Sequence, residues 1–192
     1  MAKRVFFSFH YDDVKTFRAN VVRNHSLLKE VGTAGFFDAS IWEDAELHGA
    51  DSVKRLINSN LINTSVTCVL IGSEIWRRRW VRYEILKSYD RGNKLFGIHI
   101  NSIRDKNGQT FAKGPNPFDS LGFYINSQGE LRNYQDNDGA GWKTYNDLTP
   151  TTRSFDRKFW DKGYTLSEWV PCYDWVTDGG YNNFAKWVEN AK

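Results

Sequence analysis

The stretch VTCVLIG, residues 66–72, decides the fold of this chain. It shows no alternation of apolar and polar residues, which is typical of a central strand in a parallel sheet with both faces buried. Other short runs of β-forming residues are RVFFSF (4–9), GFFDASIW (35–42) and KLFGIHI (94–100). We therefore expect four strands within residues 1–100, with 66–72 at the centre of their sheet.

Helical patterns separate these strands. Asp12 and Asp13 can cap a first helix, and a third helix is expected from Ser73 to about Arg91, where Gly92 ends it. A second helix follows a polar loop at 43–51. The apolar positions of the first two helices are Val14, Phe17, Val21 and Leu28, then Val53, Leu56, Ile57 and Leu61.

This alternation predicts an α/β fold, a flavodoxin-like, doubly wound parallel sheet flanked by helices. Ligands of such sheets bind beyond the C-terminal ends of the strands, which places them near the loops after Phe9, Trp42 and Gly72.

The second half of the chain has a different character, rich in loops, Gly and aromatic residues. In FYINSQGELRNYQ (123–135), SQG separates two alternating runs and predicts a hairpin, whereas 136–168 reads as irregular. A last strand is expected within 167–176, at a sheet edge because of Pro171, followed by a helix with Phe184, Trp187 and Val188 on one side. We expect one domain over 1–192, with a core at 1–100, an insertion at 101–166 and a final strand and helix at 167–192.

Composition excludes several classes of protein. The 26 basic and 23 acidic residues are spread along the chain, so neither direct nucleic-acid binding nor a membrane surface is expected. The apolar run near the N-terminus is too short for a signal peptide, and Cys68 and Cys172 read as free thiols, so we expect a cytoplasmic protein. The four His have no partner at metal-ligand spacing, and no metal is expected. Phosphate-binding glycine loops and a GxSxG elbow are absent.

One helix carries an organised set of side chains. Trp76, Trp80 and Glu84 lie at i, i+4 and i+8, while Val81 and Ile85 share a neighbouring face suited to the core. Two indoles beside a carboxylate suit the stacking of an aromatic base next to a negative charge. The alternative is that Glu84 is a surface residue paired with Arg77, Arg79 or Lys87, and the residues alone leave both readings open.

Three segments together resemble the TIR domain family. RVFFSFHYDDV (4–14) resembles its first box, GFFDASIWEDAELHG (35–49) its second, and the stretch from Ser52 to Ile85 its helix, central strand, Ser and Trp-x-x-x-Glu. GPNPFDSLG (114–122), the hairpin and the aromatic C-terminal part are similar to the bacterial ThsB branch, the TIR subunits of Thoeris antiphage defence.

The resemblance implies an ADP-ribosyl cyclase-type enzyme, inactive until infection, that cleaves NAD and cyclises ADP-ribose into a signalling nucleotide. A phage component would trigger it, and the diffusible signal would activate a ThsA-like, NAD-depleting effector. NAD is then substrate, with no other cofactor. By position, Glu84 matches the catalytic glutamate, Trp80 the aromatic four residues before it, and Ser8, Phe9 and His10 the substrate-binding residues after the first strand. Asp38 would end the second strand.

The match also has departures, and other functions stay open. The loop at 43–51 lacks the proline of receptor TIR loops, and no Phe follows Gly49. A non-catalytic TIR assembly module is one alternative. A nucleoside-processing hydrolase or transferase on a flavodoxin-like sheet is another.

Overall fold

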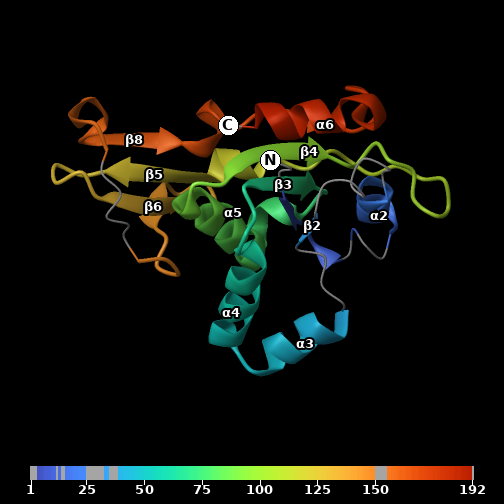
Figure 1. Ribbon diagram of the computed structural model, residues 1–192, viewed down its shortest axis with the longest axis horizontal. Helices are drawn as coiled ribbons and strands as arrows, with labels where there is room; N and C mark the ends of the chain where they lie inside the picture. The colour runs from blue at the N-terminus through green and yellow to red at the C-terminus, as the bar shows by residue number, and fades with distance from the viewer. Residues whose placement is uncertain are drawn as a thin grey trace.

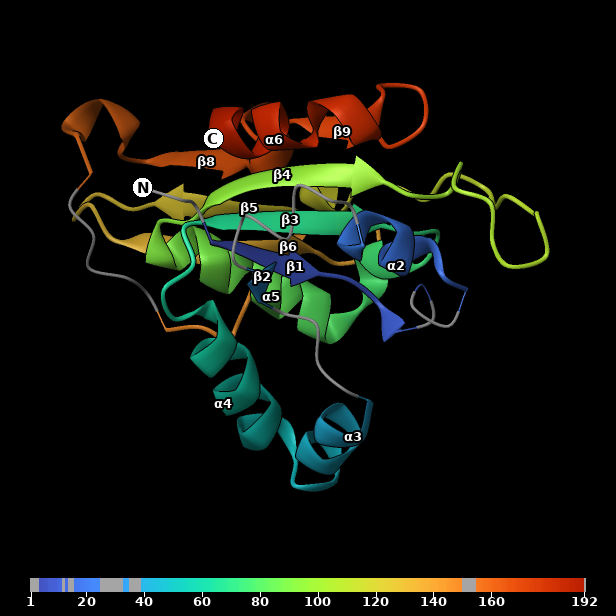
Figure 2. The same ribbon diagram turned by 45° about the vertical axis from the view of Figure 1, so that its right-hand side comes forward.

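The computed structural model describes residues 4–11, 13, 16–24, 33–34, 39–149 and 155–191. Its main sheet is five-stranded and parallel, in the order β2-β1-β3-β4-β9 (Figure 2). The strands are β1 (Val5–Ser8), β2 (Thr33–Ala34), β3 (Val66–Ile71), β4 (Lys94–His99) and β9 (Cys172–Asp174). All six residues of β3 are buried in the middle of the sheet, which confirms the prediction made from VTCVLIG. The edge strand expected near Pro171 is also confirmed, because β9 pairs with β4 at the end of the sheet.

Helices cover both faces of this sheet, as the doubly wound prediction requires (Figures 1 and 2). Phe7, Cys68 and Leu70 pack on one face with residues of α2 (Arg18–Arg23) and α6 (Gly180–Asn190). Phe6, Val69 and Ile71 pack on the other face with α4 (Ala50–Leu61) and α5 (Arg79–Arg91). A further helix, α3 (Ala39–Leu47), lies against α4, away from the sheet (Figure 1). In the part of the chain that the structure describes, no helix is both long and apolar enough to cross a membrane.

A second sheet forms in the later half of the chain. It is antiparallel, with the order β7-β6-β5-β8. The predicted hairpin is confirmed as β5 (Leu121–Ile125) and β6 (Leu131–Asp136), joined through the Gly129 turn at φ 79°. The expectation of an irregular region up to residue 168 is wrong: it contains β7 (Trp142–Thr144), β8 (Lys162–Thr165) and 3-10 turns at Arg157–Phe159 and Leu166–Glu168.

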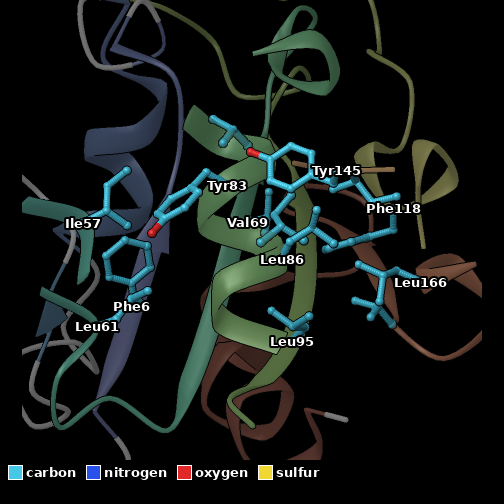
Figure 3. Packing of buried hydrophobic residues seen from close by; sticks show 14 of the residues in the cluster. Phe6, Ile57, Leu61, Val69, Tyr83, Leu86, Leu95, Phe118, Tyr145 and Leu166 are labelled. Atoms are coloured by element: carbon cyan, nitrogen blue, oxygen red, sulfur yellow. The ribbon is translucent and has the colours of Figure 1, made fainter. Parts of the chain in front are cut away.

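The two sheets share one hydrophobic cluster through α5. Val69 of β3, Leu86 of α5, and Phe118 and Leu166 from the later half belong to this cluster (Figure 3). The ring of Phe123 on β5 stacks on Tyr89 of α5, with centroids 4.9 Å apart. The second sheet therefore packs against the helix that carries Glu84.

The predicted second strand and the loop after it are wrong where the structure describes them. Residues 39–42 lie in α3 and not in a strand, and residues 43–47 continue that helix where a loop was expected. Ile41 and Trp42 favour a strand locally, but Ala39, Glu43, Ala45, Glu46 and Leu47 are all good helix formers. Ala45 is buried against the core, which anchors the helix. Residues 35–38, and with them Asp38, lie outside the described residues.

Two helix starts also differ from the predictions. Phe17 is left-handed, at φ 67°, and exposed, so it precedes α2 and is not part of its apolar face. Val14 and Leu28 lie outside the described residues. The third helix begins at Arg79 and not near Ser73, because a 3-10 turn at Ile75–Arg77 and an extended Arg78 (ψ 121°) come first. Its predicted end at Gly92 is confirmed, with Gly92 left-handed at φ 84°.

Candidate functional site

The C-terminal end of β1 supplies the first part of the site. Side chains alternate along this strand, so Ser8 shares with Phe6 the face that is turned toward α5. Ser8 is fully buried, and its Oγ donates a hydrogen bond of 2.6 Å to Oε2 of Glu84. Residues 76 positions apart in the chain are thus joined at the end of a central strand.

The first turns of α5 supply the second part. Trp80 and Glu84 are four residues apart and share one side of the helix, while Val81 and Ile85 are buried in the core as predicted. Trp76 does not continue this row, because it lies in the 3-10 turn before the extended Arg78. The predicted stack of three residues on one helical face is therefore wrong for Trp76 and correct for Trp80 and Glu84.

A cavity of about 210 Å³ lies between three elements. The lining residues are Phe7, Phe9, His10 and Tyr11 from β1 and the residues after it, Trp42 and Glu46 from α3, Arg78 just before α5, and Arg79, Trp80, Val81 and Glu84 from the first turns of α5. Its walls are mainly apolar and aromatic, and its charged side chains come from α3, from α5 and from Arg78 just before α5. Such a mixture is typical of small-molecule sites, in which a few polar groups orient a ligand against apolar walls.

Glu84 is the most perturbed carboxyl group of the cavity. It is only 4% exposed, and burial raises its pKa to about 8, although the hydrogen bond from Ser8 acts in the opposite direction. Near neutral pH this carboxyl group is therefore mostly protonated, and a positive charge placed beside it would favour the ionised form.

The surface-pair reading of Glu84 is wrong. Its candidate partners have other carboxylates: Arg77 pairs with Glu74, Arg79 with Asp147 and Lys87 with Asp90. Because Glu84 is also buried, a surface ion pair does not account for its place in the sequence.

The structure brings the predicted site residues together. Phe9, His10, Trp80 and Glu84 line the cavity, and Ser8 joins it through its hydrogen bond to Glu84. Trp42 and Glu46 were not predicted as site residues, because the local sequence favours a strand at the first and a loop at the second. Their spacing of four residues was the available signal, since it puts both on one side of a helix.

Comparisons with known proteins identify the family of this chain. A family model described as the TIR-like domain of Thoeris protein ThsB matches residues 6–105. The chain is also 53% identical, over 191 residues, to a protein of Bacillus cereus (strain MSX-D12) named "Putative cyclic ADP-D-ribose synthase ThsB1". The alignment covers 98% of this chain and 100% of that relative.

Proposed function

Since the chain belongs to the ThsB family of TIR-like proteins, we propose that it cleaves NAD and closes the resulting ADP-ribose into a cyclic signalling nucleotide. The observation that carries the proposal is Glu84, a carboxyl group buried in an aromatic cavity and hydrogen-bonded to Ser8. Membership of this family also supports a role in antiphage defence.

The bond to be broken explains why one carboxylate suffices. Glycoside hydrolysis ordinarily uses two carboxyl groups, since one must protonate the leaving oxygen. The nicotinamide ring of NAD already carries a positive charge, so it takes the bonding electron pair and leaves neutral without an acid. What remains is an oxocarbenium-like ribose, and an ionised Glu84 beside it would stabilise that charge. A nucleophilic atom of the same molecule would then bond to the cationic ribose carbon and lose a proton, which closes the ring.

The electrostatics of the cavity suit a cationic substrate. Burial holds the pKa of Glu84 at about 8 without a ligand. The nicotinamide ring, and later the ribosyl cation, would favour the ionised carboxylate at the moment that it is needed. Trp80 and Phe9 line the same cavity and would stack on flat parts of the dinucleotide, which contributes about 1 kcal/mol for each contact.

The size of the cavity limits how much of NAD it encloses. At about 210 Å³ it falls below the range of roughly 300–1,000 Å³ typical of ligand pockets. We propose that it takes the nicotinamide riboside end, between His10, Phe9 and Glu84. Arg78 lines the same cavity and is suited to the phosphates of the rest of the molecule.

Membership of the family supports a proposal for the steps before and after the reaction. We propose that a phage component triggers the enzyme and that the product diffuses to a ThsA-like effector, which depletes NAD. NAD is the substrate in this proposal, and no other cofactor takes part.

The test compares wild type and Glu84→Gln in cells challenged with phage, with mass spectrometry of lysates for a cyclic ADP-ribose isomer. We expect the variant to give no product and to keep a cooperative thermal transition, because Gln fills the same volume. Glu74→Gln is the matched control, since Glu74 lies just before the 3-10 turn that precedes α5 and pairs with Arg77. Equal product from wild type and Glu84→Gln would contradict catalysis and favour an assembly role.

A further inference from the structure

Asp147 joins the later half of the chain to the start of α5. Its Oδ2 accepts a hydrogen bond of 3.1 Å from Nε of Arg79, and its Oδ1 accepts one of 2.9 Å from Nη2. Nζ of Lys54, on α4, lies 2.8 Å from the same Oδ1. Two parallel N–H···O bonds fix the plane of a guanidinium group, which one point contact does not.

The guanidinium of Arg79 in turn covers an aromatic ring of the candidate site. It lies 4.6 Å from the ring centroid of Trp80, within the range of a cation–π contact. Tyr83 meets Trp80 edge-on, with the ring planes at 83°. Trp80 lines the cavity together with Glu84. The contacts that run from Asp147 through Arg79 to Trp80 therefore lead to the proposed substrate site.

These contacts contribute little to the stability of the fold. The side chain of Arg79 is 55% exposed and that of Asp147 is 22% exposed. Ion pairs at such exposure contribute about 0–1 kcal/mol. We therefore expect the two hydrogen bonds between Arg79 and Asp147 to fix the orientation of the guanidinium group and not to stabilise the fold.

We propose that Asp147 is a positioning residue of the cavity, orienting Arg79 so that Arg79 holds the indole of Trp80 against the substrate. The proposal rests on the NAD reaction proposed above, and it assigns to the later half of the chain a part in binding. The hydrogen bond from Arg79 lowers the pKa of Asp147, so the carboxylate stays charged at neutral pH. Without Asp147, Arg79 can turn toward the cavity that it already borders, and the indole loses its support.

The kinetic test uses Asp147→Asn, Arg79→Gln and the double variant, purified from phage-challenged cells. We expect KM for NAD to rise about threefold to fivefold with kcat changed by less than about twofold, since a misplaced contact weakens binding of the substrate. KM of the double variant should match KM of each single variant within a factor of about two, because both substitutions break the same series of contacts. Asp147→Glu should recover most of the affinity. Asp90→Asn is the control, since it removes a carboxylate that pairs with Lys87 on the same helix.

A second measurement needs no NAD. Asp147→Asn should change the tryptophan fluorescence of the free protein, and the same substitution in a Trp80→Phe background should change nothing further. Wild-type emission together with wild-type KM in Asp147→Asn would overturn the proposal. The proposal would also be overturned if every variant, Asp147→Glu included, lost thermal stability and affinity for NAD to the same extent, because that pattern is typical of a purely structural residue. Absence of NAD turnover in wild type would instead count against the proposed reaction, while the fluorescence result still decides the positioning.

Discussion

At Glu84, two effects pull the pKa in opposite directions. Burial raises it to about 8, and the hydrogen bond from Ser8 holds it below the value that burial alone would give. If the ionised carboxylate stabilises the ribosyl cation, the free enzyme gains its active form as pH rises through that pKa. Under the proposed function, Ser8 would therefore adjust the fraction of active enzyme at neutral pH.

The first prediction is a shift in the pH dependence of NAD cleavage in Ser8→Ala. Wild-type kcat/KM should increase with pH to a plateau above about 8, and the variant should reach its plateau at higher pH, because the ionised form has lost a donor. At pH 7 we expect activity to fall by about threefold to tenfold. Rate profiles between pH 6 and 10 measure this shift.

Ser88→Ala serves as the control for that profile. Ser88 is a buried serine on the same helix that accepts a hydrogen bond of 2.9 Å from Thr67, away from the cavity lining. A midpoint that stays in place in Ser8→Ala would mean that Glu84 is not the group that the profile reports.

The sequence predicts the site residues correctly where they belong to a short local pattern. Trp80 and Glu84 lie on one helix, and Phe9 and His10 directly follow a strand, so their positions follow from the elements that carry them. The hydrogen bond between Ser8 and Glu84 joins distant segments, and spacing alone does not reveal such a contact. Arg79 is similar, because its partner Asp147 is 68 residues away.

Among the elements, α5 shows how tertiary contacts set a boundary that the sequence hides. Nothing between Ser73 and Arg79 forbids a helix, and the residues there are acceptable helix formers. Gly114 packs so closely on this segment that an added Cβ would lie 2.3 Å from the carbonyl oxygen of Gly72. The chain makes a 3-10 turn and an extended step instead, and α5 starts one turn before Glu84.

The second prediction follows from that late start. Trp80 lies in α5 and lines the cavity, whereas Trp76 lies in the turn before it and lies outside the cavity lining. Trp80→Ala should raise KM for NAD about fivefold to tenfold, because one stacking contact of about 1 kcal/mol is lost. Trp76→Ala should leave KM within about twofold. Steady-state kinetics on the two variants measure the difference, and equal effects would contradict the placement of the helix start.

At the scale of the whole molecule, the alternation of strands and helices was enough to predict the parallel sheet. The second sheet was only half predicted, since the hairpin of β5 and β6 has a local turn signal but β8 pairs with β5 across a long connection. Strands of three and four residues such as β7 and β8 are too short for an alternating pattern to stand out. Their positions come from pairing with β6 and β5.

The last prediction tests whether the packing of the second sheet against α5 makes the two sheets one cooperative unit. Phe123 is 4% exposed, lies on β5 and stacks on Tyr89 of α5, so Phe123→Ala leaves a void between the second sheet and α5. We expect the free energy of unfolding to fall by about 3 kcal/mol, in a single transition, because Phe123 belongs to the hydrophobic cluster that both sheets share. Denaturant unfolding followed by tryptophan fluorescence and by circular dichroism measures this free energy.

Trp142→Ala is the control, because Trp142 is an exposed aromatic residue on the same sheet. This substitution should lower the free energy of unfolding by less than about 1 kcal/mol. Separate transitions for the two probes would show that the sheets unfold independently, and that contacts such as Arg79 with Asp147 could then open without loss of the parallel sheet.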